Sequence, residues 1–167
     1  MPDALAVISR VISEHHAIRQ HVRLAGDSLN DFEALFSLHQ AQSTLSQSSI
    51  ENLDEKQTQM QQAVTSLEQG LKTHFAFEEK YLLPLFGELL AQAFLHEHHK
   101  IAGQIESARK TLADTRLEGL SRQELFARKS GMQQTINDLC QVVDEHASHE
   151  EIILNMMKKT LEAGGKL

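Results

Sequence analysis

Four histidines and two glutamates are the residues of this chain whose types and spacing could do chemistry. In two segments a histidine lies four residues before a glutamate, so both side chains of each pair share one face of a helix. Two further histidines lie in a stretch that occurs twice, Glu-His-His-x-Ile, at 14–18 and 97–101. Imidazole nitrogens and carboxylate oxygens suit iron or manganese, and zinc or nickel can take the same donors. The six candidate metal ligands are His15, His74, Glu78, His98, His146 and Glu150.

Helices must position these residues, because the composition is poor in turn-forming residues. The 167-residue chain has two prolines and eight glycines. Its long runs of Ala, Leu, Glu, Gln and Lys favour helix over strand. We predict an all-α fold, an up-down-up-down four-helix bundle, as a single domain over residues 1–167.

The predicted helices cover about residues 3–28, 31–42, 54–83 and 89–113, with a connection at 43–52. The helix that ends near residue 83 should bend or stop at Pro84. The last helix starts at a capping box formed by Ser121 and Glu124 and extends to about residue 161. A break is expected at Ser130 and Gly131, because an unbroken helix would overhang the bundle.

The apolar stripe of each predicted helix passes through the candidate ligands. Val64, Leu67 and Leu71, for example, continue at the same spacing to His74 and Glu78. Unpaired carboxylates in an apolar interior cost several kcal/mol, and metal cations would supply the missing charge. The repeated ligand set indicates approximate two-fold symmetry.

Two metals that share both glutamates and have two histidines each receive four protein donors apiece. Octahedral ions then keep open positions. A bridging oxo or hydroxo group can fill one of them, and O₂, NO or peroxide can bind at another.

The order and spacing of the six residues resemble those of the hemerythrin-like, or HHE cation-binding, domains over essentially the whole chain. The resemblance implies a non-heme di-iron centre in which the four histidines are terminal ligands and the two glutamates bridge the irons. Oxygen-carrying hemerythrins have His-x-x-x-His in the third helix. In this chain the residues four positions from His98 are Phe94 and Ala102. This departure argues against reversible oxygen carriage.

The expected function is oxygen or NO binding or sensing at a di-iron centre. The alternative is a redox enzyme, or a protein that repairs iron centres or handles iron, using the same site. The expected partners are a diatomic ligand (O₂ or NO) or peroxide, and a redox or signalling protein. Turnover and oligomeric state stay open.

Composition excludes several other classes of partner. The net charge is −7 and the basic residues form no dense run, so a nucleic-acid partner is not expected. We also expect no membrane span and no signal peptide. The single cysteine, Cys140, cannot form an internal disulfide, which suits a reducing compartment. The expected location is cytoplasmic.

Several neighbours of the candidate ligands have weaker claims to the site. His16 and His99 lie about 100° away from the apolar stripe. Tyr81 could donate a hydrogen bond to a bound oxygen species, although ordinary packing is the favoured interpretation. His39 could reach the site as an extra ligand or lid, although solvent exposure is the favoured interpretation. Three other residues are expected on a solvated face or just outside the ligands: Glu79, His149 and Glu151.

Overall fold

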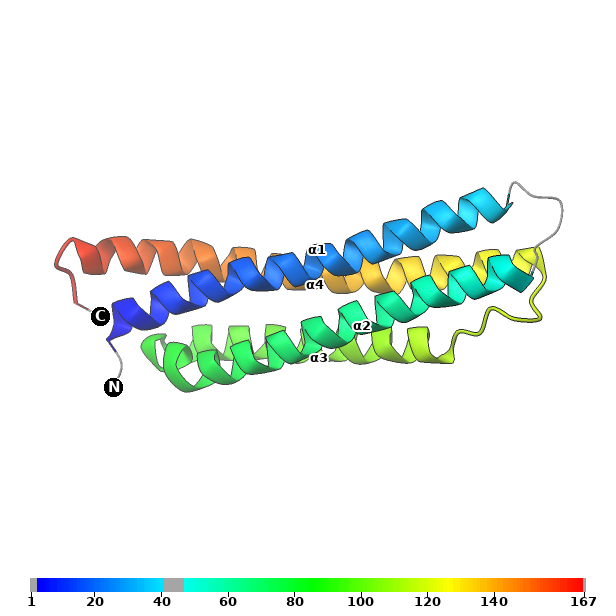
Figure 1. Cartoon of the computed structure of the whole chain (residues 1–167). Helices are drawn as coiled ribbons and strands as arrows, with labels where there is room; N and C mark the ends of the chain where they lie inside the picture. The colour runs from blue at the N-terminus through cyan, green and yellow to red at the C-terminus, as the bar shows by residue number, and fades with distance from the viewer. Residues whose placement is uncertain (1–2, 41–46, 167) are drawn as a thin grey trace.

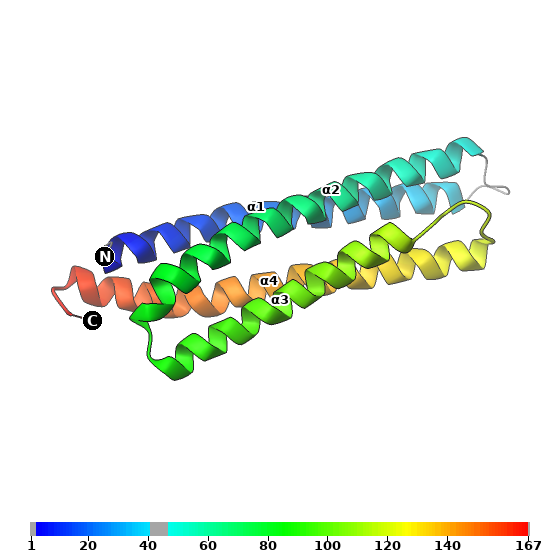
Figure 2. The ribbon, with the colours of Figure 1, turned by 90° about the horizontal axis from the view of Figure 1, so that it is seen from below.

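Four long helices run alternately up and down in a computed structural model that describes residues 3–40 and 47–166. They are α1 (Ala4–Gln40), α2 (Gln47–Phe77), α3 (Glu88–Asp114) and α4 (Arg122–Glu162). Helix α1 packs against α2 and α4, and α3 packs against the same two helices. Figures 1 and 2 show the start of α1, the end of α4 and the turn between α2 and α3 at one end of the bundle. The predicted four-helix bundle is confirmed, and no strand occurs in the described ranges.

Helix α1 is continuous, so the predicted division into helices at 3–28 and 31–42 is wrong. The apolar spacing passes through the supposed break, because Ala25, Leu29 and Phe32 are all buried. Packing of this stripe outweighs the weak helix propensity of Gly26 and its neighbours. Helix α2 begins at Gln47, inside the connection predicted at 43–52. The rest of that connection, residues 43–46, lies outside the described residues.

Helix α4 is also unbroken, and the break predicted at Ser130 and Gly131 is wrong. The overhang is avoided because the chain runs on past the end of α3 before it turns into α4 (Figure 2). The side-chain amide of Gln57 holds the start of this connection by donating to the carbonyls of Leu112 and Thr115, both at 2.7 Å. The capping box predicted at Ser121 is confirmed.

Helix α2 changes its winding at the residue predicted to be a ligand. A π-helical turn, η1 (Glu78–Leu82), follows α2 and leads into a 3₁₀ turn, η2 (Leu83–Leu85). Pro84 lies in the first turn of η2, where the missing N–H removes no helical hydrogen bond. The helical run therefore tightens at the predicted Pro84 and ends one residue later, at Leu85, after a wider turn of the kind that often marks functional sites.

Two apolar clusters fill the bundle above and below the candidate ligands. The larger contains Ile18, Leu71 and Ile101, each three residues from a candidate histidine. The smaller, near the chain ends, contains Val11 and Leu82, each four residues from a candidate ligand. The ligands thus occupy a polar layer between two apolar ones. Over the described residues, no helix is long and apolar enough to cross a membrane.

Candidate metal centre

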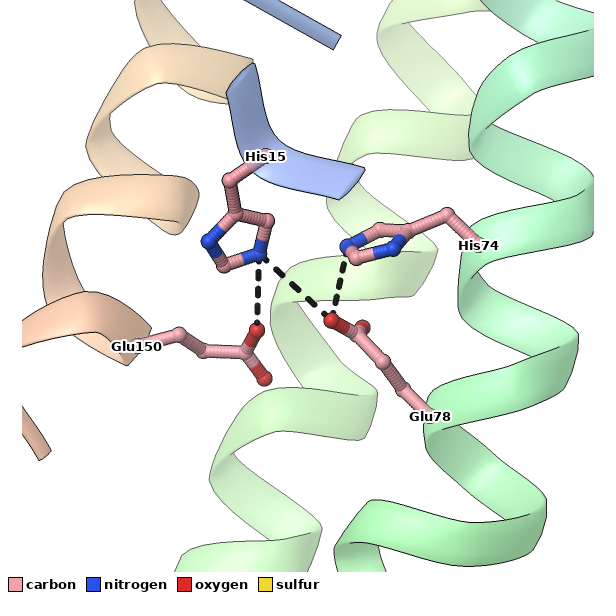
Figure 3. Close-up of side chains that lie close together, drawn as sticks. All are labelled: His15, His74, Glu78 and Glu150. Atoms are coloured by element: carbon pink, nitrogen blue, oxygen red, sulfur yellow. Dashed lines mark ion pairs between the residues drawn. The ribbon is translucent and has the colours of Figure 1, made fainter. Parts of the chain in front are cut away.

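All six predicted ligands meet in the middle of the bundle and are buried, with at most 3% of any of them exposed. They come from all four helices and from η1. Four of them, one histidine each from α1 and α2 and the two glutamates, point toward one another in Figure 3. The ligand atoms form two groups of four within 4.8 Å of one another, and both groups contain both glutamates. The groups are His15, His74, Glu78 and Glu150, and His98, His146, Glu78 and Glu150.

Glu78 lies between the two pairs of histidines. Its Oε1 is 2.7 Å from His74 Nε2 and 3.5 Å from His15 Nε2. Its Oε2 is 3.1 Å from His98 Nε2 and 3.9 Å from His146 Nε2. One carboxylate oxygen therefore faces each half of the cluster, which is the arrangement of a bridging ligand.

Glu150 also contacts both halves. Its Oε2 is 3.3 Å from His15 Nε2 and 3.8 Å from His146 Nε2. Every histidine of the cluster thus turns Nε2 inward, toward the two carboxylates.

The inward-facing atoms have no hydrogen-bond partners among the described residues. They are the Nε2 atoms of the four histidines and both oxygens of each glutamate, and each is buried. An unsatisfied buried polar atom costs about 1 to 3 kcal/mol, and more if it is charged. Cations bound between the two carboxylates would satisfy all of these atoms at once, so the donor set fits a metal centre.

The outward-facing nitrogens contact a second set of carboxylates. His74 Nδ1 lies 2.8 Å from Glu14 Oε2, and His98 Nδ1 lies 3.0 Å from Glu79 Oε1. His146 Nδ1 lies 2.8 Å from Glu97 Oε2. His15 Nδ1 lies 3.3 Å from Glu151 Oε1, without hydrogen-bond geometry.

Of these four outer carboxylates, the sequence interpretation left Glu79 and Glu151 either on a solvated face or just outside the ligands, and the structure places both beside the ligands. The sequence interpretation gave no role to Glu14 or Glu97. The signal was present, because each precedes a predicted ligand in the repeated Glu-His-His stretch. His149, which was placed with Glu79, donates to Glu97 at 2.9 Å from an exposed position.

Burial and mutual contact shift the pKa values of the cluster in opposite directions. Burial opposes protonation of His15, but contacts with Glu150 and Glu78 outweigh it and raise the pKa to about 9. Burial opposes ionisation of Glu78, yet three histidine contacts hold its pKa well below the usual value. Burial and repulsion from Glu78 raise the pKa of Glu150 to about 7, despite its contact with His15. The histidines alone therefore do not stabilise both carboxylates as anions, whereas bound cations would.

Aromatic side chains close the centre on the α3 side. Phe75 stacks on His98 with ring centroids 3.9 Å apart, and Phe94 meets the edge of His146 at 6.1 Å. Phe94, one of the two residues four positions from His98, is buried. In the described part of the chain, no additional His, Cys, Asp or Glu joins either group of four.

The remaining candidates lie away from the centre. His16 and His99 are exposed, as their helical positions predicted. Tyr81 packs with Phe77 in the smaller apolar cluster, with ring centroids 5.0 Å apart. His39 is 24 residues beyond His15 on α1, about 36 Å along the axis, so it is neither a ligand nor a lid of this centre. Its expected solvent exposure is also wrong, because it is 8% exposed.

Comparison with known proteins identifies the family of the chain. No curated protein and no solved structure matches the chain. The family model described as the hemerythrin HHE cation binding domain matches residues 7–157, which include all six candidate ligands. The chain therefore belongs to the hemerythrin HHE cation-binding family.

Proposed function

We propose that this protein binds two iron ions at the buried centre and uses them to bind or sense O₂ or NO, or to react with peroxide. One observation carries the proposal. The inward atoms of four histidines and two shared glutamates lie buried, without hydrogen-bond partners among the described residues, in two groups of equal composition. Nitrogen and oxygen donors without thiolate favour iron or manganese.

The two groups of donors give each ion two histidines and a share of two carboxylates. Two bound irons supply redox-active ions with coordination positions left for a small ligand. The protein holds the histidine rings in place and excludes bulk water through the apolar clusters on both sides. No fifth histidine joins either group among the described residues, so the two metals have matching protein donors, which supports a binding site different from that of oxygen carriers.

The test is metal content followed by anaerobic spectroscopy. Protein from iron-supplemented medium should contain about two irons per chain, and the absorption spectrum of its reduced form should change on addition of O₂ or NO. His74→Ala should sharply lower the metal content, whereas His16→Ala, at an exposed position beside His15, should not. A reversible change supports binding or sensing, and consumption of peroxide supports the redox alternative. Full metal loading of His74→Ala would contradict the ligand assignment.

A further inference from the structure

The four outer carboxylates link the helices around the centre in a closed circuit. Each lies next in sequence to a candidate ligand of its own helical run, but reaches a histidine of the neighbouring helix. The circuit runs from Glu14 of α1 to α2, from Glu79 of η1 to α3, from Glu97 of α3 to α4, and from Glu151 of α4 back to α1. Every helical run provides one carboxylate and receives one.

The chemistry of neutral imidazole explains how these contacts can orient the histidines. A histidine that binds a metal through Nε2 must carry its proton on Nδ1, and a carboxylate that accepts this proton fixes both the tautomer and the ring orientation. At three of the four histidines, the Nδ1-to-oxygen distance is 2.8 to 3.0 Å. The fourth contact, from His15, is longer, and Glu151 also accepts from Arg19.

The outer carboxylates can carry charge at low cost because water reaches them. Their side chains are between 21% and 45% exposed, whereas those of the inner glutamates are fully buried. Two of them also have basic partners on the outside: Arg10 contacts Glu14, and Arg19 contacts Glu151. They are therefore suited to hold histidines and not to enter the inner groups.

We propose that Glu14, Glu79, Glu97 and Glu151 are positioning residues that act in two pairs, one pair for each metal. Glu14 and Glu151 hold the histidines of one group, and Glu79 and Glu97 hold those of the other. This inference rests on the proposed function, since it assumes that both groups bind a metal. It adds that the two metal affinities can be changed separately from outside the centre.

Cobalt(II) is a suitable probe, because it shifts the proton resonances of its ligands far from the rest of the NMR spectrum. We expect four shifted, exchangeable resonances from the Nδ1 protons, one for each histidine. Glu97→Ala should speed the solvent exchange of one of these protons, that of His146. It should also lower the affinity for one of the two cobalt ions by about 10- to 100-fold. Glu97→Gln keeps an acceptor oxygen and should keep the resonance. Glu14→Ala should speed the exchange of the His74 proton and lower the affinity for the other ion.

The matched control is Glu106→Ala, since Glu106 lies on the same helix as Glu97 and is 76% exposed. It should leave all four resonances and both affinities unchanged. Circular dichroism at each step confirms that the variants are folded. If the wild-type protein binds no cobalt, the proposed function fails. In another outcome, the wild-type protein binds two ions while Glu97→Ala and Glu14→Ala leave the exchange rates and affinities unchanged, or lower both affinities equally. Either result overturns the positioning role in pairs and leaves the metal centre in place.

Discussion

Replacing Glu150 by glutamine should stabilise the metal-free protein and reduce the stabilisation that bound metal provides. Glu150 is fully buried, and burial together with repulsion from Glu78 raises its pKa from 4.5 to about 7. Without metal, its ionised form therefore opposes folding. Glutamine has nearly the same shape but no charge, so Glu150→Gln removes this cost. With metal bound, the same substitution removes a donor that both groups share.

The expected size follows from the pKa difference. Each pKa unit corresponds to about 1.4 kcal/mol, so a rise from 4.5 to about 7 costs the ionised wild-type protein about 3 kcal/mol at pH 8. For a chain of this length, that difference raises the Tm of the variant by about 6 to 12 °C. The cost is present above the folded pKa and disappears as the pH falls through 7 to 4.5. The advantage of the variant should therefore shrink between pH 8 and pH 5.

Thermal unfolding followed by circular dichroism, with a chelator and then with Zn²⁺, tests both the higher stability without metal and the smaller gain with metal. Zinc at 100 times its dissociation constant should stabilise the wild-type protein by about 2.7 kcal/mol for each site. The gain for Glu150→Gln should be much smaller. Glu145→Gln, at an exposed position five residues away on the same helix, is the control and should change neither measurement. A metal-free variant that is less stable than wild type at pH 8, with an unchanged response to zinc, would refute the reasoning.

Three further predictions concern the scaffold. Gly131→Ala should raise the free energy of unfolding in urea by about 1 kcal/mol, because α4 is continuous there and an added methyl group meets no atom within 4 Å; a loss of stability would contradict an unbroken helix. Ser121→Ala should lower that free energy by about 1 kcal/mol, since it removes the capping box, and an unchanged unfolding midpoint would argue against the cap. Burial raises the pKa of Cys140 from 9.0 to about 11, so at pH 8 its alkylation should be about 100-fold slower in native than in unfolded protein; equal rates would show that the thiol is not protected.

The burial and convergence of the six candidate ligands could be predicted from the sequence because helical phase is a strong signal. His74 and Glu78 continue a stripe of residues that are all buried, and polar groups at such positions need a compensating partner. The same reasoning failed for the helix ends. The predicted breaks lie between residues 28 and 31 and at Ser130 and Gly131, but a glycine costs a helix only about 1 kcal/mol, less than the packing of one long apolar stripe contributes.

The π-helical turn at Glu78 could not be predicted, because it depends on the whole bundle. An ordinary helix would place Tyr81 close to the face of Glu78, which is why a contact with the site was considered. The wider turn shifts every later residue around the axis. Leu82 and Leu83 are consequently both buried, and Tyr81 packs beside Phe77 in the smaller apolar cluster.

The sense of the outer circuit follows from helix handedness and chain direction. On α1 and α3 the outer carboxylates, Glu14 and Glu97, come one residue before an inward ligand. On the oppositely directed runs, Glu79 and Glu151 come one residue after an inward ligand. Each step of one residue rotates the side chain by about 100° about the axis of its own helix. Viewed along the bundle, a step back on a helix that runs up and a step forward on one that runs down rotate in the same sense. All four carboxylates therefore turn toward the neighbour on the same side.

Steps in the other direction should turn side chains toward the opposite neighbour, and the structure agrees. His149 comes one residue before Glu150 on α4, and it contacts Glu97 on α3. Phe77 comes one residue before Glu78, and its ring lies 3.7 Å from the guanidinium of Arg10 on α1. Because one residue decides the direction, an inward ligand and the residue beside it serve different helices. An antiparallel bundle can therefore encode both layers of a symmetric centre in adjacent pairs of residues.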